Sequence, residues 1–307
     1  MITKKKKFKL KRADLILLLF ALPAALHILI FQYLPMGGIV LAFKNYRVDK
    51  GIFGSDWYGF KNFEFFFTSQ DAWMVLRNTI LLNVAAIVLG KFVAITIAIL
   101  LNEVTKRWKV KTYQTILFLP YFLSWVIVSY MVFAFLSPTY GILNQWIVGA
   151  GGQKIDWYRA KEYWPAILIL LGIWKGMGYN SVIYFSAIMG LDKEYYEAAR
   201  IDGATRFQMA TKLTVPLIMP AILLTTILDM GGILTSDFGL FYIVPKQSSY
   251  LYDVTTVLDV YIYRALAITG NTGISAATGL FKSVVGTIMI LTTNAIVNKI
   301  DKNSAIF

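Results

Sequence analysis

Six long apolar runs constrain this chain more than any other feature of its sequence. A bilayer core of about 30 Å needs about 20 consecutive apolar residues per helix, and each run is near that length or longer. The runs are Leu15 to Tyr33, Asn78 to Leu101, Tyr113 to Leu136, Pro165 to Met189, Thr214 to Ser236 and Ala276 to Val297. The mean hydropathy of +0.60 lies well above that of soluble domains. We therefore predict an all-α polytopic membrane protein with six transmembrane helices.

The first apolar run has two readings. It follows Lys4, Lys5, Lys6 and Lys7, as the core of a secretory signal peptide would. However, the run is longer than a typical signal core and no clear cleavage site follows it. We therefore expect an uncleaved anchor. The predicted organisation is a basic N-terminal segment at 1–14, a transmembrane domain at 15–298 and a tail at 299–307.

Lysine and arginine positions predict the orientation of the spans. With a cytosolic N-terminus, the inner segments 1–12, 102–112, 190–213 and 298–307 carry 17 of these residues. The outer loops 34–77, 137–164 and 237–275 carry 10 in nearly twice the length. This excess follows the positive-inside rule, so both termini of this multi-pass protein are expected in the cytosol. It also accounts for the net charge of +13 without a nucleic-acid partner.

The composition excludes several kinds of chemistry. The chain has no cysteine and one histidine, His27, which excludes disulfides, thiol nucleophiles and multi-histidine metal sites. No G-x-x-x-x-G-K-[ST] phosphate loop occurs, because Gly90-Lys91 is followed by Phe92 and lacks the earlier glycine. We expect no catalytic residues, no metal and no cofactor on this chain.

The loop between spans four and five, residues 190–216, carries strong helix-boundary signals. Asp192 is a good N-cap for a short helix from Lys193 to about Ile201, and Gly203 can adopt the left-handed conformation that ends it. Thr205 and Gln208 form a T-x-x-Q capping box for a second helix that runs toward span five. We call residues 190–216 the elbow.

The spacing of residues in the elbow allows two interpretations, a docking site for another protein or a simple connector. Its corner is almost free of bulky side chains, which would let another protein's backbone approach, and Glu197 adds a negative charge beside it. A well-capped connector would need the same helix caps, so docking and simple connection remain equally open on these residues.

A resemblance to a known family favours docking. Glu197-Ala198-Ala199, then Gly203, then Leu213-x-Val215-Pro216 resembles the EAA loop, E-A-A-x3-G-x9-I-x-L-P, of permease subunits of binding-protein-dependent ABC importers. The departures are Leu for Ile and Val for Leu. The segments 33–63 and 236–245 are similar to those of the polysaccharide-permease group that includes the LplB proteins, and the six-span plan resembles the maltose-type, carbohydrate-uptake branch. The resemblance covers nearly the whole chain.

The resemblance implies a type I importer permease fold, a place in the bacterial cytoplasmic (plasma) membrane and a shared mechanism. ATP would be hydrolysed by a cytosolic ABC ATPase dimer docked at the elbow, with a second six-span permease as a heterodimer partner and an extracytoplasmic solute-binding protein delivering an oligosaccharide. The implied coupling residues are Glu197, Ala198, Ala199, Gly203, Ala204, Arg206 and Pro216. Pro216 and Pro220 are expected to fix the entry of span five.

Polar residues within the spans mark a candidate substrate path, because each is costly in hydrocarbon. The expected path residues are Trp174, Tyr179 and Asn180 of span four, Asn83 of span two, and Asp229 and Asp237 of span five. The two aspartates are eight residues apart, so we expect them on one side of a helix. Simpler roles remain open. Lys91 could be the partner of an acid or snorkel to the interface, and Lys175 could pair with Asp229. Asp237 could cap the helix or touch the binding protein, and Trp174 and Tyr179 could be packing residues.

Two other functional classes are less consistent with the sequence. A self-contained secondary carrier normally has broken spans and inverted repeats, and neither is evident. An intramembrane enzyme would need paired carboxylates or a nucleophile with a base, and two helical turns separate Asp229 from Asp237.

Overall fold

The computed structural model describes residues 12–302 and 305–306, so most of the predicted basic N-terminal segment and part of the C-terminal tail lie outside the described residues. The longer helices are α1 (Arg12–Ile28), α4 (Gln70–Asn102), α5 (Arg107–Phe122), α6 (Trp125–Leu136), α8 (Trp164–Met189), α12 (Met219–Gly231), α14 (Leu258–Ala267) and α15 (Thr272–Ile300). The shorter α-helices are α2 (Gly51–Gly54), α3 (Lys61–Thr68), α7 (Ile142–Gly149), α9 (Lys193–Ile201), α10 (Arg206–Gln208), α11 (Val215–Leu217) and α13 (Tyr252–Thr255). The π- and 3-10 segments are η1 (Leu29–Tyr33), η2 (Leu34–Phe43), η3 (Lys161–Tyr163), η4 (Met209–Thr214), η5 (Gly239–Ile243) and η6 (Ser249–Leu251).

The all-α membrane fold is confirmed, with a correction to two of the spans. Among the residues that the structure describes, four helical segments are long and apolar enough to cross a bilayer, and two bent helix pairs raise the number to six if each pair is one span. The pair Arg107–Phe122 and Trp125–Leu136 is bent by 94°, and the pair Arg206–Leu217 and Met219–Gly231 by 61°. The expectation that no span is broken was therefore wrong for spans three and five.

Proline and capping residues explain where these spans break. Pro120 lies in the last turn of α5, and the Ser124 side chain accepts a hydrogen bond from the Ile127 amide to start α6. In span five, Pro216 and Pro220 flank the break at Ile218. Neither proline can donate the amide hydrogen bond that a continuous helix would use.

Span five also ends earlier than predicted. α12 stops at Gly231, and the chain then turns through residues 232–236, so Asp229 and Asp237 are not on one helix. The Asn83 amide donates hydrogen bonds to the carbonyls of Ile233 (2.7 Å) and Thr235 (3.2 Å). These bonds from α4 satisfy backbone groups that would otherwise be open in the bilayer.

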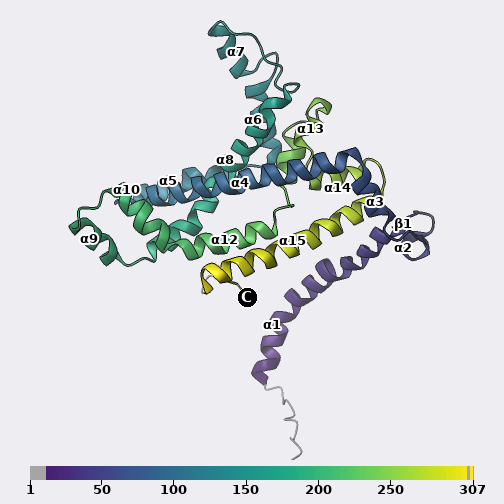
Figure 1. Ribbon diagram of the computed structural model, residues 1–307, viewed down its shortest axis with the longest axis horizontal. Helices are drawn as coiled ribbons and strands as arrows, with labels where there is room; N and C mark the ends of the chain where they lie inside the picture. Colours follow the sequence, from purple (N-terminus) through teal and green to yellow (C-terminus); the bar gives the residue numbers. More distant parts are fainter. Residues whose placement is uncertain (1–11, 303–304, 307) are drawn as a thin grey trace, which may run out of the picture.

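The helices that carry the polar groups pack side by side. α4 contacts α8 along its length, α5 contacts α8, and α12 and α14 contact α15 (Figure 1). One buried cluster joins Leu82 of α4, Trp164 and Leu168 of α8, and Phe241 of η5. α1 stands apart from this bundle in Figure 1, and every side chain from Leu15 to Gly37 is exposed.

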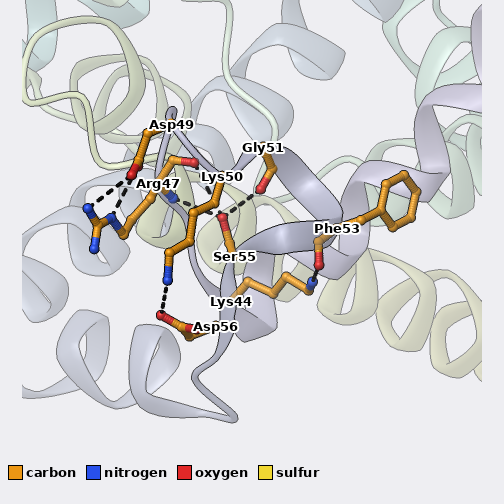
Figure 2. Close-up of polar contacts among 8 residues, drawn as sticks. All are labelled: Lys44, Arg47, Asp49, Lys50, Gly51, Phe53, Ser55 and Asp56. Atoms are coloured by element: carbon orange, nitrogen blue, oxygen red, sulfur yellow. Dashed lines mark hydrogen bonds and ion pairs between the residues drawn. The ribbon is translucent and has the colours of Figure 1, made fainter.

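The elbow and a small hairpin lie at opposite ends of the molecule in Figure 1. The hairpin pairs β1 (Lys44–Asn45) with β2 (Asp56–Trp57) and encloses α2. Figure 2 shows its internal contacts, in which Arg47 binds Asp49 and Lys50 binds Asp56. Its charges are thus largely balanced within the hairpin.

A polar network links three of the bundle helices. The Lys91 Nζ of α4 lies 2.6 Å from the Asp229 carboxylate of α12 and donates to the Thr225 hydroxyl at 3.0 Å. The Tyr184 hydroxyl of α8 is 2.8 Å from the same Thr225 oxygen. Asp229 therefore pairs with Lys91, which confirms Lys91 as the partner of an acid, and the alternative pairing of Asp229 with Lys175 was wrong. The sequence does not show which lysine lies beside Asp229, because Lys91, Lys175 and Asp229 come from three different spans.

We predict that the Lys91–Asp229 pair stabilises the bundle as a unit. Lys91→Met or Asp229→Leu alone should each lower the free energy of unfolding by about 1–3 kcal/mol, because each leaves an unpaired charge in a partly buried site. The double variant, which leaves no charge, should recover most of this loss. Thermal midpoints of the purified chain in detergent measure the effect, and a double variant with the sum of the two single losses would contradict the pairing.

Candidate functional site

The elbow is built by local caps, and each predicted cap is confirmed. α9 begins after Asp192, whose side chain accepts the Glu194 amide at 3.1 Å, and it ends at Ile201 as expected. The Thr205 hydroxyl accepts the Gln208 amide at 3.2 Å, while the Gln208 side chain accepts the Thr205 amide at 2.8 Å. A reciprocal capping box of this kind fixes where the second helix starts.

Gly203 makes the corner between the two helices. Its φ of +77° lies in the left-handed region that L-residues other than glycine rarely adopt. The Gly203 amide bonds to the Arg200 carbonyl and the Ala204 amide to the Ala199 carbonyl at 2.9 Å, which together form a Schellman motif. The helix ends are thus satisfied within the elbow itself.

Two side-chain contacts brace the elbow against neighbouring segments. The Tyr196 hydroxyl of α9 lies 2.9 Å from the hydroxyl of Thr214, which is buried in η4. Arg206 forms an ion pair with Glu103 at the end of α4 at 3.0 Å. The first contact fixes α9 to the helix that leads into span five, and the second ties the elbow to span two.

The corner presents a hollow with apolar side chains around it. A cavity of about 330 Å³ lies there; its lining residues are Ala199, Asp202, Gly203, Ala204, Gln208, Met209, Lys212 and Leu213. Ile201 is 87% exposed and Phe207 is 76% exposed beside it. The sequence analysis did not single out these two residues, although a bulky apolar residue on each side of the Gly203 corner was a visible signal.

The residues expected for coupling lie together in the elbow. Ala199, Gly203 and Ala204 line the hollow, while Glu197 and Ala198 are exposed on α9 next to it. Glu197 makes no ion pair with any residue that the structure describes. Arg206 starts the second helix and Pro216 lies at its far end, before the bend into α12.

A larger cleft lies between the bundle helices. It has a volume of about 610 Å³ and is lined by α4, α8, α12, the end of α5, the start of α6 and the residues around η5. The Lys91–Asp229 pair, Thr225 and Tyr184 all face it. A cleft of this size and mixed polarity can hold part of a polar solute.

The cleft brings together most of the residues predicted for a substrate path. Asn83, Asn180, Asp229 and Asp237 line it, although they come from separate segments. The Asp237 carboxylate caps η5 by accepting the Gly239 amide (2.9 Å) and also accepts Trp125 Nε1 (2.7 Å).

Two predicted path residues lie outside this lining. Tyr179 stacks on Tyr121 with centroids 4.7 Å apart, and it is 48% exposed. Trp174 packs against the buried cluster of α8 and η5.

Three further lining residues were missed or misread from the sequence. Lys175 points into the cleft and donates to the Tyr121 carbonyl at 2.7 Å, and its ammonium lies 5.3 Å from the ring centroids of both Tyr121 and Trp125. Tyr121 and Trp125 flank the break in span three, so no local pattern places them beside span four.

Comparison with known proteins is consistent with this architecture. Residues 86–302 match the family described as "Binding-protein-dependent transport system inner membrane component". The chain is 36% identical to the polygalacturonan/rhamnogalacturonan transport system permease protein YteP of Bacillus subtilis, over 92% of this chain and 88% of that protein. It is also 36% identical to protein LplB of Bacillus subtilis, over 95% of this chain and 91% of that protein.

A solved structure extends the similarity to three dimensions. A crystal structure of a bacterial ABC transporter involved in the import of the acidic polysaccharide alginate contains a chain with a TM-score of 0.86 and 33% identity. The match covers 94% of this chain and 97% of that chain. The resemblance to the LplB group is therefore confirmed, and the chain belongs to the family of binding-protein-dependent transport system inner membrane components, as an ABC transporter permease of the type I fold.

Proposed function

We propose that this chain is a permease subunit that moves an oligosaccharide or polysaccharide fragment into the bacterial cytoplasm, driven by ATP hydrolysis on a separate ATPase dimer. The observation that carries the proposal is the connection between the elbow and the cleft. The helical run Arg206–Leu217 forms the second half of the elbow. After the bend at Ile218 the chain continues into α12, which carries Thr225 and Asp229 to the cleft wall.

In this proposal, the elbow is the docking site of the ATPase. The hollow at Gly203 leaves room for a partner's backbone or side chains, and Ile201 and Phe207 are apolar groups that a partner would remove from water. The free carboxylate of Glu197 supplies a charge for a basic partner group. ATPase docking would place the elbow, and with it both chain termini, in the cytosol, in line with the positive-inside asymmetry.

The elbow would act as a rigid lever during transport. Its caps satisfy the backbone groups at the helix ends, and the Tyr196–Thr214 contact opposes independent movement of α9. The exposed Arg206–Glu103 pair joins α10 to the end of α4. A displacement of α9 by a closing ATPase dimer would then move the start of α12 and span two together. Asp229 and Lys91, one on each of these spans, would move with them and change the shape of the cleft.

The proposed partners and substrate follow from the family and its relatives. The family description implies an extracytoplasmic binding protein, and the relatives named for transport or import act on polygalacturonan, rhamnogalacturonan and alginate. The Asn180 side chain supplies hydrogen-bonding groups suited to sugar hydroxyls. Asn83, bonded to the carbonyls of Ile233 and Thr235, and Asp229, paired with Lys91, lie on the same cleft wall. We infer that a second six-span permease completes the path and covers part of the exposed helix surface.

Two elbow variants should uncouple transport while leaving the protein in the membrane. Gly203→Val forces a β-branched residue into a left-handed conformation, at a cost of about 1–2 kcal/mol. Glu197→Lys reverses a docking charge. Glu197→Lys should lower oligosaccharide uptake about tenfold or more, in line with the loss of a charged contact at an interface. Gly203→Val should lower uptake about tenfold, because the strain disfavours the corner by about that factor. Glu162→Lys, a charge reversal on the exposed η3 segment away from the elbow, is the matched control. Wild-type uptake in both elbow variants would contradict a coupling role.

Co-purification tests the docking site directly. The tagged chain, extracted in detergent with its partner subunits, should retain a soluble ATPase. Replacement of residues 193–213 by a glycine-serine linker of equal length should release that ATPase and leave the second permease bound. Retention of the ATPase by the linker variant would place the docking site elsewhere.

A further inference from the structure

Lys175 is a cation in the middle of a membrane helix without an acidic partner. It lies eleven residues into the 26-residue helix α8, and no carboxylate pairs with it in the part of the chain that the structure describes. Charged groups at this depth are costly unless they are paired or face a water-filled path, and such residues are usually functional. Lys175 lines the cleft, so its charge faces the path.

The other charged groups of the cleft are already satisfied. Lys91 and Asp229 neutralise each other at 2.6 Å. The Asp237 carboxylate accepts bonds from the Gly239 and Leu240 amides and from Trp125 Nε1, so both of its oxygens are occupied. Lys91 also spends two of its three ammonium donors, on Asp229 and Thr225. Lys175 uses only one, on the Tyr121 carbonyl, so it keeps two donors and an unneutralised charge for a ligand.

The surroundings of Lys175 hold its ammonium in place. Tyr121 and Trp125 each lie 5.3 Å from it, measured to the ring centroid, and they come from opposite sides of the break in span three. Aromatic faces attract a cation without neutralising it. The Tyr121 carbonyl, at the end of α5, adds a further fixed contact. The result is a pre-oriented positive charge that faces the cleft.

We propose that Lys175, oriented by Tyr121 and Trp125, is a subsite for the carboxylate of an acidic sugar residue as it passes through the cleft. This inference rests on the proposed function and narrows its substrate class to oligosaccharides that contain uronic acids. Asn180, five residues further along α8 and also on the cleft wall, has no hydrogen-bond partner among the described residues and is available for a neighbouring sugar hydroxyl.

Lys175 also satisfies a carbonyl at the end of α5, so the test must separate recognition of the substrate from support of the bend. We suggest uptake into proteoliposomes by the full complex with its binding protein, using trigalacturonate and its methyl ester, which lacks the charges. The wild-type complex should prefer the acid. Lys175→Gln should lower the ratio of acid to ester uptake about tenfold or more, whereas Lys175→Arg should retain the preference.

Lys246→Gln is the matched control. Lys246 is another lysine near aromatic rings, 3.7 Å from the ring centroid of Phe133, but it does not line the cleft. This variant should keep the wild-type ratio. Equal slowing of both oligomers by Lys175→Gln, or a wild-type preference for the ester, would overturn the subsite and leave the proposed function intact. Failure of the wild-type complex to import any oligosaccharide, acidic or neutral, would instead overturn the proposed function.

A labelling measurement tests the same Lys175 subsite without the binding protein. The chain has no cysteine, so Met177→Cys, at a cleft-lining residue with no assigned contact to substrate, places a unique thiol of this subunit on the cleft wall. Trigalacturonate should slow maleimide labelling of this thiol in the complex, the methyl ester should not, and Lys175→Gln should abolish the protection. Equal protection by the two oligomers, or protection that persists in Lys175→Gln, would contradict the carboxylate subsite.

Discussion

Backbone groups inside a bilayer must find partners within the protein, and this requirement shapes the centre of the molecule. Spans three and five are broken, and each break frees amides and carbonyls that no helix satisfies. Side chains from neighbouring helices supply partners for several of these groups. Lys175 binds the Tyr121 carbonyl, Asn83 binds the Ile233 and Thr235 carbonyls, and Asp259 accepts the Ser236 amide at 2.7 Å.

The same breaks create the candidate transport path. A continuous helix presents only side chains, whereas the bend between α5 and α6 brings Tyr121 and Trp125 to one wall, and the end of α12 allows Asp237 to reach another. Irregular backbone at membrane depth is tolerated where it lines a cavity. The elbow connects to this region through α12. We therefore regard the cleft and the elbow as two ends of one mechanical unit, with the Lys91–Asp229 pair between them.

The sequence predicted the features that depend on neighbours along the chain and missed those that depend on distant ones. The caps at Asp192, Gly203, Thr205 and Gln208 are local, and all four were predicted. The six apolar runs were also recognised. The break in span three and the pairing of Asp229 were missed, because hydropathy does not register a bend and because Lys91 and Lys175 are indistinguishable as partners without the packing of α4, α8 and α12.

The broken spans raise one alternative, because secondary carriers often use broken helices near the midplane. Membership of the binding-protein-dependent family favours an external energy source. A transport assay distinguishes an ATP-driven importer from a secondary carrier. It measures uptake of oligosaccharide into proteoliposomes that contain the purified complex, with binding protein outside and ATP enclosed. Our account predicts uptake that requires the enclosed ATP and persists when ion gradients are collapsed. Uptake driven by an ion gradient without ATP would contradict it.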